Sequence, residues 1–413
     1  MSTAMRQLVH GRRDDVAAPW QRTAAGSNLL GDDGGLGVTI FEEMTTLAAR
    51  TGAINLGQGF PDEDGPAEIA AAAMDAIRNG ANQYAPGKGT LTLRTAVAHH
   101  QERFYGLTPD PETDIIVTTG ATEALAATLL ALTGPGDEVL TFEPFYDSYG
   151  AIIGLSGARH TTSPLLAPDF QPDLDALEAA FSARTRMVVV NNPHNPMGSV
   201  FSRDALTRIV ELAHRYDALI VTDEVYEHLT FDVPHIPMAT LPGAAERTLT
   251  ISSAGKTFSF TGWKVGWLSG PADLVAAVRT VKQFLTYSSG APFQDAVALG
   301  LGLPDSFYTG IASALKAKRD LLSSGLRQAG FDVFTPQGTY FVNVDTAPLG
   351  FADSLDLARR MPEQIGVAAI PVPVFCHPDG ARRTRSLLRF AFCKKTEVLK
   401  DAAQRLASLQ KGL

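Results

Sequence analysis

Short apolar runs rich in β-branched residues alternate with helical patterns along the middle of the chain. Several of these runs are apolar at consecutive positions, which is typical of strands covered by helices on both faces. One helical pattern, over residues 204–216, places Leu206 and Ile209 on one face, with Ser202 as the expected N-cap. This alternation predicts an α/β fold with a mostly parallel sheet. The six expected strands are Ile115–Thr119, Glu138–Phe142, Met187–Val190, Ala218–Thr222, Thr248–Ser252 and Val265–Ser269.

The pattern changes along the chain and divides it into four parts. Residues 1–37 show no periodicity and end in a Gly/Asp run, so we expect a flexible N-terminal arm. Residues 61–302 contain the six strands and form the predicted large domain. Residues 303–413 begin with a long helical pattern and predict a smaller α+β domain, to which residues 38–60 are expected to contribute.

Composition narrows the class of protein before any motif is considered. The 413 residues include 35 Lys+Arg and 44 Asp+Glu, a net charge of −9, which argues against nucleic acid or an anionic membrane as a partner. No run of 18 apolar residues occurs, so no membrane-spanning helix is expected. Cys376 and Cys393 lack metal-type spacing, and the first residues lack an apolar signal core, so a cytoplasmic protein is expected.

Small or polar residues follow the expected strands, at the ends where open α/β sheets bind ligands. Gly120, Ala121 and Thr122 open a helix, where backbone N–H groups and the helix dipole favour an anion such as phosphate. An ordinary helix start is the alternative. Residues 191–198 form a Pro- and Asn-rich loop that is expected to point the amides of Asn191 and Asn195 inward.

A carboxylate and an amine follow two further strands. Asp223 is costly to bury unless it is paired, for example with a positive ring nitrogen, although a carboxylate that caps the next turn gives the same pattern. Lys256 follows Ser253 among small residues, where desolvation would make its amine a nucleophile, and Lys264 lies eight residues on. A surface lysine is the alternative. Together, the phosphate cradle, amide loop, acid and amine fit pyridoxal phosphate.

Several short motifs between residues 39 and 409 occur together in this chain. They are Asn55–Pro61, Asn82–Tyr84, Asn195–Gly198, Thr222–Tyr226, Ser253–Lys256, Thr261–Lys264 and Arg389-Phe390. As a set they resemble the class I and II aminotransferases of fold type I, in the branch of kynurenine, glutamine and methionine aminotransferases. Residues 65–66, 143–149 and 290–294 resemble actinobacterial proteins assigned to N-succinyldiaminopimelate transamination. The family implies a large domain with a mostly parallel, seven-stranded type of sheet between helices, and a smaller α+β domain.

The resemblance implies a role for each matching residue near the cofactor ring. Lys256 is expected to form the Schiff base with pyridoxal phosphate and then to carry a proton between substrate and cofactor. Asp223 is expected to keep the pyridine nitrogen protonated. The phenolic oxygen of the ring is expected to be bound by Tyr226 and Asn195, with Asn191 in support.

The resemblance also implies how the phosphate, the ring face and the substrate are held. The phosphate-binding residues are expected to be Gly120, Ala121, Thr122, Ser253 and Lys264, joined by Tyr84 from the partner subunit of a homodimer with shared active sites. Tyr146 is expected to stack on the ring. Arg389 is expected to clamp the substrate α-carboxylate as a bidentate fork, helped by the Gly59 backbone and by Asn195. Phe41 and Tyr287 are candidates for lining the side-chain pocket, and ordinary core packing would explain them equally well.

These inferences predict a ping-pong aminotransferase that moves an amino group from an L-amino acid to a 2-oxo acid, with 2-oxoglutarate and glutamate as the expected pair. Two substrate classes stay open: amino acids of the kynurenine, glutamine or methionine type, and N-succinyl-LL-diaminopimelate of lysine biosynthesis. A cysteine-S-conjugate β-lyase, which would use the same cofactor site, also stays open as the function. A cofactor-binding regulator is a third class, and the complete set of site residues argues against it.

Two further groups of residues carry weaker signals. Glu224, Glu227 and His228 follow Asp223 closely, as metal ligands could, but the His-Glu-x-x-His spacing is absent and exposed turn residues explain the three better. The sequence therefore predicts no metal site. Lys88 is a candidate for binding a distal carboxylate of N-succinyldiaminopimelate.

Overall fold

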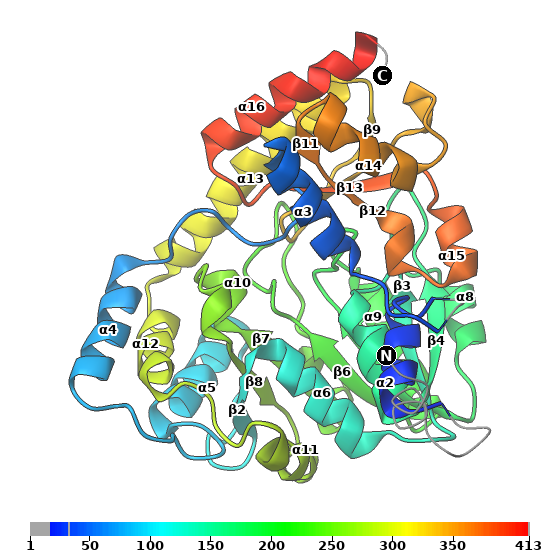
Figure 1. The fold of residues 1–413 in the computed structure, drawn as a ribbon. Helices are drawn as coiled ribbons and strands as arrows, with labels where there is room; N and C mark the ends of the chain where they lie inside the picture. The colour runs from blue at the N-terminus through cyan, green and yellow to red at the C-terminus, as the bar shows by residue number, and fades with distance from the viewer. Residues whose placement is uncertain (1–16, 32–33, 412–413) are drawn as a thin grey trace, which may run out of the picture.

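The computed structural model describes residues 17–31 and 34–411 of the chain (Figure 1). Its largest sheet consists of β2 (Ile115–Thr119), β3 (Glu138–Glu143), β4 (Arg159–Pro164), β5 (Thr185–Asn191), β6 (Leu219–Asp223), β7 (Thr248–Ser253) and β8 (Val265–Ser269). The order across the sheet is β2-β8-β7-β6-β5-β3-β4. Within this sheet β8 runs antiparallel to β2 and β7, and the other neighbouring strands are parallel. The predicted α/β fold with a mostly parallel sheet is confirmed.

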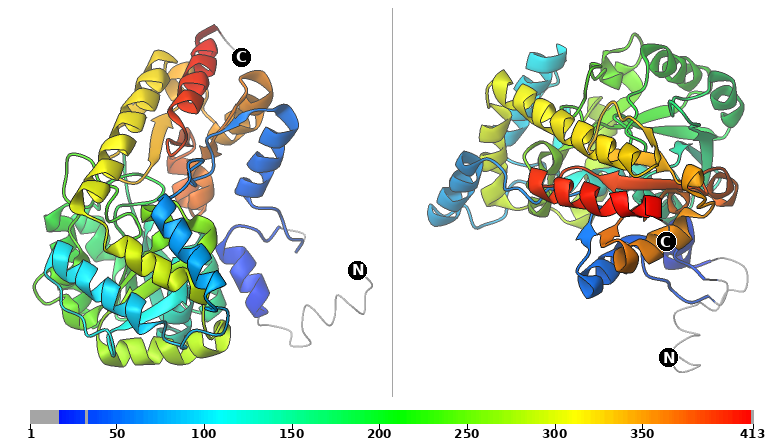
Figure 2. Two further views of the ribbon diagram at one scale, coloured as in Figure 1. Left: turned by 90° about the vertical axis from the view of Figure 1, so that its left-hand side faces the viewer. Right: turned by 90° about the horizontal axis from the view of Figure 1, so that it is seen from above.

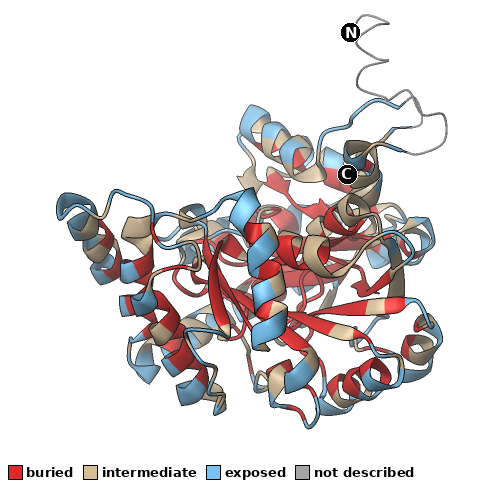
Figure 3. Ribbon diagram, turned by 90° about the horizontal axis from the view of Figure 1, so that it is seen from below, coloured by how far each residue is buried: buried red, intermediate tan, exposed pale blue. Residues whose placement is uncertain are grey.

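The six predicted strands form close to their expected ends, and β4 is the strand of the large sheet that the sequence pattern missed. Its sequence, Arg-His-Thr-Thr-Ser-Pro, is polar because β4 lies at the edge of the sheet and pairs only with β3. An edge strand is partly solvated and needs no continuous apolar run. The inner strands are buried almost throughout, and Figure 3 shows them in red beneath the surrounding helices.

Helices cover both faces of the large sheet. They are α4 (Ala67–Arg78), α5 (Leu91–Tyr105), α6 (Gly120–Leu132), α7 (Asp147–Ser156), α8 (Leu174–Ala180), α9 (Arg203–Arg215), α10 (Ala254–Thr257), α11 (Ala272–Leu285) and α12 (Ala291–Leu301). Alternate residues of β5 show the two faces, because Val188 packs in the same core as α9 whereas Val189 packs with α6 and α7. The helix α9 begins as predicted, since the Ser202 hydroxyl accepts a hydrogen bond from the Ala205 N–H at 3.2 Å.

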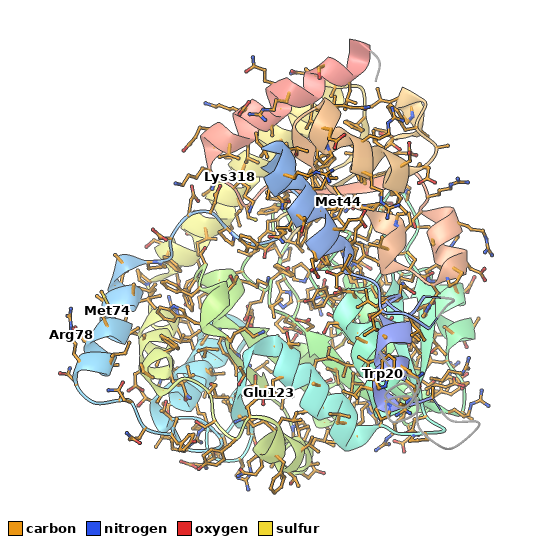
Figure 4. The ribbon with its side chains drawn as sticks, viewed as in Figure 1. Trp20, Met44, Met74, Arg78, Glu123 and Lys318 are labelled. Carbon is orange, nitrogen blue, oxygen red and sulfur yellow. The ribbon has the colours of Figure 1, made fainter. Side chains whose placement is uncertain are left out.

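A smaller four-stranded antiparallel sheet lies above the large one in Figure 2, left. Its strands, in the order β12-β13-β10-β9, are β9 (Asp332–Phe334), β10 (Phe341–Asp345), β12 (Ile370–Pro371) and β13 (Leu387–Ala391). The helices around it are α3 (Ile40–Thr51), α13 (Asp305–Gln328), α14 (Ser354–Gln364), α15 (Pro378–Arg383) and α16 (Thr396–Leu406). Met44, labelled on α3 in Figure 4, is only 1% exposed in this core.

The segment before residue 60 joins this smaller part through a strand pair. β1 (Ile54–Asn55) pairs in parallel with β11 (Val367–Ala368), which supports the proposed assignment of residues 38–60 to the smaller domain. Short 3₁₀ helices occupy Met238–Thr240, Ala245–Arg247, Thr261–Trp263, Ala347–Leu349, Val372–Phe375 and Ala407–Lys411. Across residues 17–31 and 34–411, no helix combines the length and apolar character that crossing a bilayer requires.

Part of the N-terminal arm is helical, contrary to the prediction. The helix α2 (Pro19–Gly26) packs closely against α7, with Gly26 facing Gly150. Hydrophobic periodicity does not indicate this helix, because it has eight residues and Ala24 is its buried residue. Residues 1–16 and 32–33 of the predicted arm lie outside the described residues.

Candidate active site

The carboxyl ends of β2, β5, β6 and β7 meet at one edge of the large sheet, beside a cavity of about 380 Å³. The antiparallel strand β8 begins at the same edge, directly after Lys264. Most of the predicted site residues line this cavity, and the exceptions are Tyr84, Lys88 and Tyr287. Those lining it are Phe41, Gly59, Gly120, Ala121, Thr122, Tyr146, Asn191, Asn195, Asp223, Tyr226, Ser253, Lys256, Lys264 and Arg389.

Lys256 lies on α10, the short helix that directly follows β7. Its Nζ donates a hydrogen bond to the Tyr340 hydroxyl at 3.0 Å, and that hydroxyl donates to the Gly59 carbonyl oxygen at 2.6 Å. Burial lowers the pKa of Lys256, and the charge of Lys264 acts in the same direction, against the opposing effect of Asp223. A lowered pKa gives a larger neutral fraction, so the amine is a better nucleophile and proton acceptor near neutral pH.

Asp223 ends β6 and is the acid of the cavity. Its Oδ2 accepts a hydrogen bond from the Tyr149 hydroxyl at 2.7 Å, and its Oδ1 accepts one from the Val225 N–H at 3.4 Å. Burial raises the pKa of Asp223, while these hydrogen bonds and the charge of Lys256 oppose the rise. A cation placed beside this carboxylate would favour its charged form further.

A chain of hydrogen bonds connects the asparagine loop to Arg389. The Asn191 amide donates to the Asp223 carbonyl oxygen at 2.9 Å and accepts from the Asn195 N–H at 2.6 Å. Arg389 donates to Oδ1 of Asn195 at 2.9 Å and to the Gly57 carbonyl oxygen at 3.1 Å. Its Nε has no hydrogen-bond partner among the described residues. Burial lowers the pKa of Arg389 to about 10, so the guanidinium remains charged at neutral pH.

The start of α6 forms an anion cradle with Lys264. Gly120, at the first position of α6, has a φ of +72°, and a Cβ there would lie 3.3 Å from both Cε and Nζ of Lys264. The first N–H groups of a helix have no partner within the helix, and the dipole places partial positive charge there. Thr122 and Ser253 line the same cavity and can add hydroxyl donors. This arrangement suits a phosphate dianion.

Aromatic side chains form other parts of the cavity wall. The Arg389 guanidinium lies 4.0 Å from the Phe341 ring centroid and 5.7 Å from that of Phe41. Tyr226 is 2% exposed, and burial raises its pKa above the ordinary range, which keeps its hydroxyl protonated and able to donate. Tyr146 lines the cavity as the N-cap residue of α7.

Three residues named from the sequence lie away from the cavity. Tyr84 is 86% exposed, and its ring contacts that of Tyr287 edge-on at 5.6 Å. Lys88 forms an ion pair with Glu112. Within the described part of the chain, Tyr84, Lys88 and Tyr287 are all missing from the cavity lining.

Sequence reasoning missed two tyrosines that hold the acid and the amine. Tyr149 and Tyr340 are 2% and 1% exposed, and their hydroxyls contact Asp223 and Lys256. Tyr149 belongs to the motif at residues 143–149, in which the family resemblance assigns a site role to Tyr146 and none to Tyr149. A tyrosine in a buried motif beside a predicted site requires a hydrogen-bond partner, and that requirement was the available signal.

The acidic and histidine side chains that follow β6 are buried or half-buried, so the prediction of exposed turn residues at Glu224, Glu227 and His228 is wrong. Glu227 accepts a hydrogen bond from the Tyr105 hydroxyl at 2.7 Å. Nε2 of His228 lies 2.7 Å from Nε2 of His100. Two nitrogens bound to one tetrahedral zinc ion would be about 3.3 Å apart. The observed separation is that of a hydrogen bond between the two rings.

The donor set of the cavity fits pyridoxal phosphate. Lys256 provides an amine for its aldehyde, Asp223 a carboxylate for its ring nitrogen, and the α6 start with Lys264 a cradle for its phosphate. The Nε of Arg389, which has no hydrogen-bond partner among the described residues, is available to a carboxylate. A cavity of about 380 Å³ is of the size that small-molecule sites have.

Comparison with known proteins identifies the family. Residues 51–406 match the family model of aminotransferase class I and II. The chain is 50% identical over 381 residues to a probable N-succinyldiaminopimelate aminotransferase DapC of Mycobacterium tuberculosis, covering 90% of this chain and 96% of that protein. It is 40% identical over 375 residues to methionine aminotransferase of Escherichia coli, covering 91% and 96%. The solved N-succinyldiaminopimelate aminotransferase of Mycobacterium tuberculosis matches with a TM-score of 0.88, covering 90% of this chain and 97% of that chain. The chain belongs to the class I and II aminotransferases of fold type I and is a pyridoxal-phosphate-dependent aminotransferase.

Proposed function

We propose that this aminotransferase runs a ping-pong cycle in which an L-amino acid gives up its amino group and 2-oxoglutarate collects it. The observation that carries the proposal is that the Lys256 amine and the Asp223 carboxylate line one cavity and interact electrostatically. Pyridoxal phosphate, when bound, draws electrons from the α-carbon of the substrate and so makes its proton removable. In this proposal, the side chains of the chain bind the cofactor and the substrate and move the proton.

Lys256 moves the proton in this proposal. Its lowered pKa makes the free amine a proton acceptor near neutral pH, where general bases work best. The Tyr340 hydroxyl, 3.0 Å from Nζ, limits the positions that the amine can take. Because a single amine can accept the proton from the α-carbon and donate it again, no second base is needed.

Asp223, Tyr226 and Asn195 hold opposite edges of the cofactor ring in this proposal. Asp223 pairs with the protonated ring nitrogen, which the hydrogen bond from Tyr149 supports by favouring the carboxylate form. Tyr226 donates its hydroxyl hydrogen to the phenolic oxygen. Asn195 accepts from Arg389 through Oδ1, which leaves its Nδ2 to donate to the same oxygen.

Arg389 binds the α-carboxylate of each substrate in this proposal. Asn195 and the Gly57 carbonyl fix its guanidinium in one plane, so two parallel N–H donors can meet a carboxylate. Gly59 packs against Phe341, since a Cβ there would be 2.4 Å from Cζ of that ring, and the same ring lies 4.0 Å from the Arg389 guanidinium. Positioning the α-carbon next to Lys256 is the main contribution of this clamp.

The proposed assembly is a homodimer with shared active sites, in the cytoplasm. Tyr84 and Phe284 are 86% and 87% exposed in the single chain, and Tyr84 contacts a further exposed aromatic ring, that of Tyr287. Neighbouring exposed aromatic groups are typical of interaction surfaces. The partner's Tyr84 would then add its hydroxyl to the phosphate cradle formed by Gly120, Ala121, Thr122, Ser253 and Lys264. Both cysteines are free, which suits a reducing compartment.

N-succinyl-LL-diaminopimelate is the proposed substrate, with lysine biosynthesis as its context. The support is the 50% identity to a relative of that name over 90% of this chain. A second candidate, an aromatic or sulfur-containing amino acid, is favoured by the rings of Phe41, Phe60 and Phe341 along the cavity. Lys88 no longer supports the first candidate, because it pairs with Glu112.

A panel of amino donors with 2-oxoglutarate tests these proposals. Glutamate formation is measured with N-succinyl-LL-diaminopimelate, methionine, kynurenine and glutamine, and the highest kcat/KM is expected for N-succinyl-LL-diaminopimelate. A higher value for methionine or kynurenine would favour the second candidate. Ammonia and pyruvate released from a cysteine conjugate without any oxo acid would instead indicate the β-lyase. Failure of every donor to form glutamate would contradict the proposed cycle.

A further inference from the structure

The N-terminal helix α2 crosses α7 at glycine residues of both helices. A Cβ on Gly26 would lie 2.1 Å from the Gly150 carbonyl oxygen, and a Cβ on Gly154 would lie 2.3 Å from the Arg22 carbonyl oxygen. Only glycine allows backbones to approach this closely. The Arg22 guanidinium also donates from Nε to the Gly154 carbonyl oxygen at 3.1 Å. The two helices therefore fit by shape at their backbones, and Ala24 is the buried residue of α2.

The helix α7 depends on its neighbours for stability. Its sequence, Asp-Ser-Tyr-Gly-Ala-Ile-Ile-Gly-Leu-Ser, contains two glycines and two adjacent isoleucines, and both residue types disfavour an isolated helix. One face packs into the core of the large sheet through Ile153, which is 0% exposed. The other face is the one that α2 contacts. If the two helices separate, α2 is released, because α7 is anchored in the core.

The first turn of α7 is also a wall of the cofactor cavity. Tyr146, Asp147 and Ser148 line the cavity, and the hydroxyl of Tyr149 donates to Asp223 at 2.7 Å. Tyr149 directly precedes Gly150, the residue that faces α2. The position of the tyrosine hydroxyl and the docking of α2 therefore depend on the same turn of helix.

We propose that α2 is a positioning element of the cofactor site, which holds Tyr149 against Asp223 through the glycine crossing with α7. The inference rests on the proposed role of Asp223 toward the ring nitrogen. None of the described residues of α2 lines the cavity, so α2 acts through Tyr149. Displacing α2 loosens the first turn of α7, weakens the hydrogen bond to Asp223 and lowers the affinity for the cofactor.

The substitution Gly154→Ala tests the inference in the full-length chain, because the three atoms nearest to the added Cβ would be backbone atoms of Arg22 and Thr23 in α2. In an unobstructed helix this substitution is stabilising, so a harmful effect reports the crossing. Titration of cofactor-free protein with pyridoxal phosphate is expected to give a roughly tenfold higher Kd. Hydrogen exchange of residues 147–153 in the cofactor-free protein is expected to become faster. Gly26→Ala, which obstructs the crossing from the α2 side, is expected to behave in the same way.

A matched control and a double-substitution cycle separate positioning from general stability. Gly310→Ala, in α13 where a Cβ would meet nothing within 4 Å, is expected to leave the Kd and the exchange of α7 unchanged. In a Tyr149→Phe background, Gly154→Ala is expected to weaken cofactor binding no further, because the hydrogen bond through which α2 acts is already absent.

Each other outcome has a definite meaning. Equal weakening by Gly154→Ala in both backgrounds would show that α2 only stabilises the fold, and it would overturn the inference. Wild-type affinity and exchange in both Gly154→Ala and Gly26→Ala would overturn it as well. If Tyr149→Phe alone leaves the cofactor affinity unchanged, the proposed role of Asp223 fails together with the inference. If Tyr149→Phe lowers the cofactor affinity but Gly154→Ala does not, only the inference fails.

Discussion

Replacing Tyr149 with phenylalanine removes one hydroxyl group from the cavity wall and leaves the ring in place. Tyr149 is 2% exposed, and its hydroxyl donates to Oδ2 of Asp223 at 2.7 Å. Its ring also packs edge-on against Tyr146 with centroids 5.7 Å apart, a contact that phenylalanine preserves. The variant therefore changes the hydrogen bonding of Asp223 with little change in packing.

The expected loss follows from the strength of a hydrogen bond to a charged group. Such a bond contributes about 1.5–3 kcal/mol, which corresponds to a roughly 10- to 150-fold weaker affinity for pyridoxal phosphate. The pH dependence changes in a defined direction. Burial raises the pKa of Asp223 and the Tyr149 hydroxyl opposes that rise, so removing the hydroxyl raises this pKa further. The carboxylate is then protonated at a higher pH, and the acid side of the binding profile moves upward.

Fluorescence titration of the cofactor-free protein across a pH series measures both effects. Tyr105→Phe is a matched control, because Tyr105 donates to a buried carboxylate, Glu227, at the same 2.7 Å but outside the cavity. The control is expected to lower thermal stability without moving the acid side of the binding profile. An unchanged Kd and an unchanged profile in Tyr149→Phe would refute the reasoning.

Three further substitutions have expected outcomes. Lys256→Ala is expected to bind the cofactor without the visible absorbance of the lysine-linked form, and its turnover is expected to be roughly 10²- to 10⁴-fold lower. Wild-type turnover in this variant would contradict the role proposed for Lys256. Arg389→Lys keeps the charge but loses the fork, so steady-state kinetics are expected to show a higher KM and a roughly 10- to 100-fold lower kcat/KM for amino donors, and an unchanged KM would contradict the clamp. Burial alone would raise the pKa of Glu138, but hydrogen bonds from Ser182, Arg159 and Arg184 lower it from 4.5 to about 2. Glu138→Gln is therefore expected to lower Tm at neutral pH, as measured by scanning calorimetry. The difference in Tm from the wild type is expected to shrink as pH falls from about 4.5 to 2. A Tm difference independent of pH would argue against the lowered pKa of Glu138.

The sheet edge that carries the candidate site could be predicted because its main residues follow strands directly. Local apolar patterns identified β6 and β7, and Asp223 and Lys256 lie at or just after their carboxyl ends. Parallel strands then place both ends at one edge of the sheet without any knowledge of long-range contacts. Arg389 was identified only through the family resemblance, because nothing in its local sequence connects it to Asn195, 194 positions away.

The features that escaped prediction depend on contacts between distant parts of the chain. Tyr149 and Tyr340 contact residues 74 and 84 positions away, so their roles follow from tertiary packing alone. Glu227 carries a carboxylate, which the sequence alone places at the surface. A hydrogen bond from Tyr105, which lies on another element, allows it to be buried. The helix α2 is stabilised by backbone shape at Gly26, for which hydrophobic periodicity gives no signal.

Arg389 shows how one cavity can serve both halves of a ping-pong cycle. The guanidinium is 2% exposed, and its hydrogen-bond partners among the described residues, an amide oxygen of Asn195 and a carbonyl of Gly57, are neutral. Removing such an ion from water costs several kcal/mol, which neutral partners and aromatic faces restore only in part. In the proposed role of Arg389, a carboxylate that arrives with the substrate would complete the pairing, and binding energy would be concentrated on the group that amino acids and 2-oxo acids share. Preference among side chains must then come from the remaining walls of the cavity, where Phe41 and Phe60 lie.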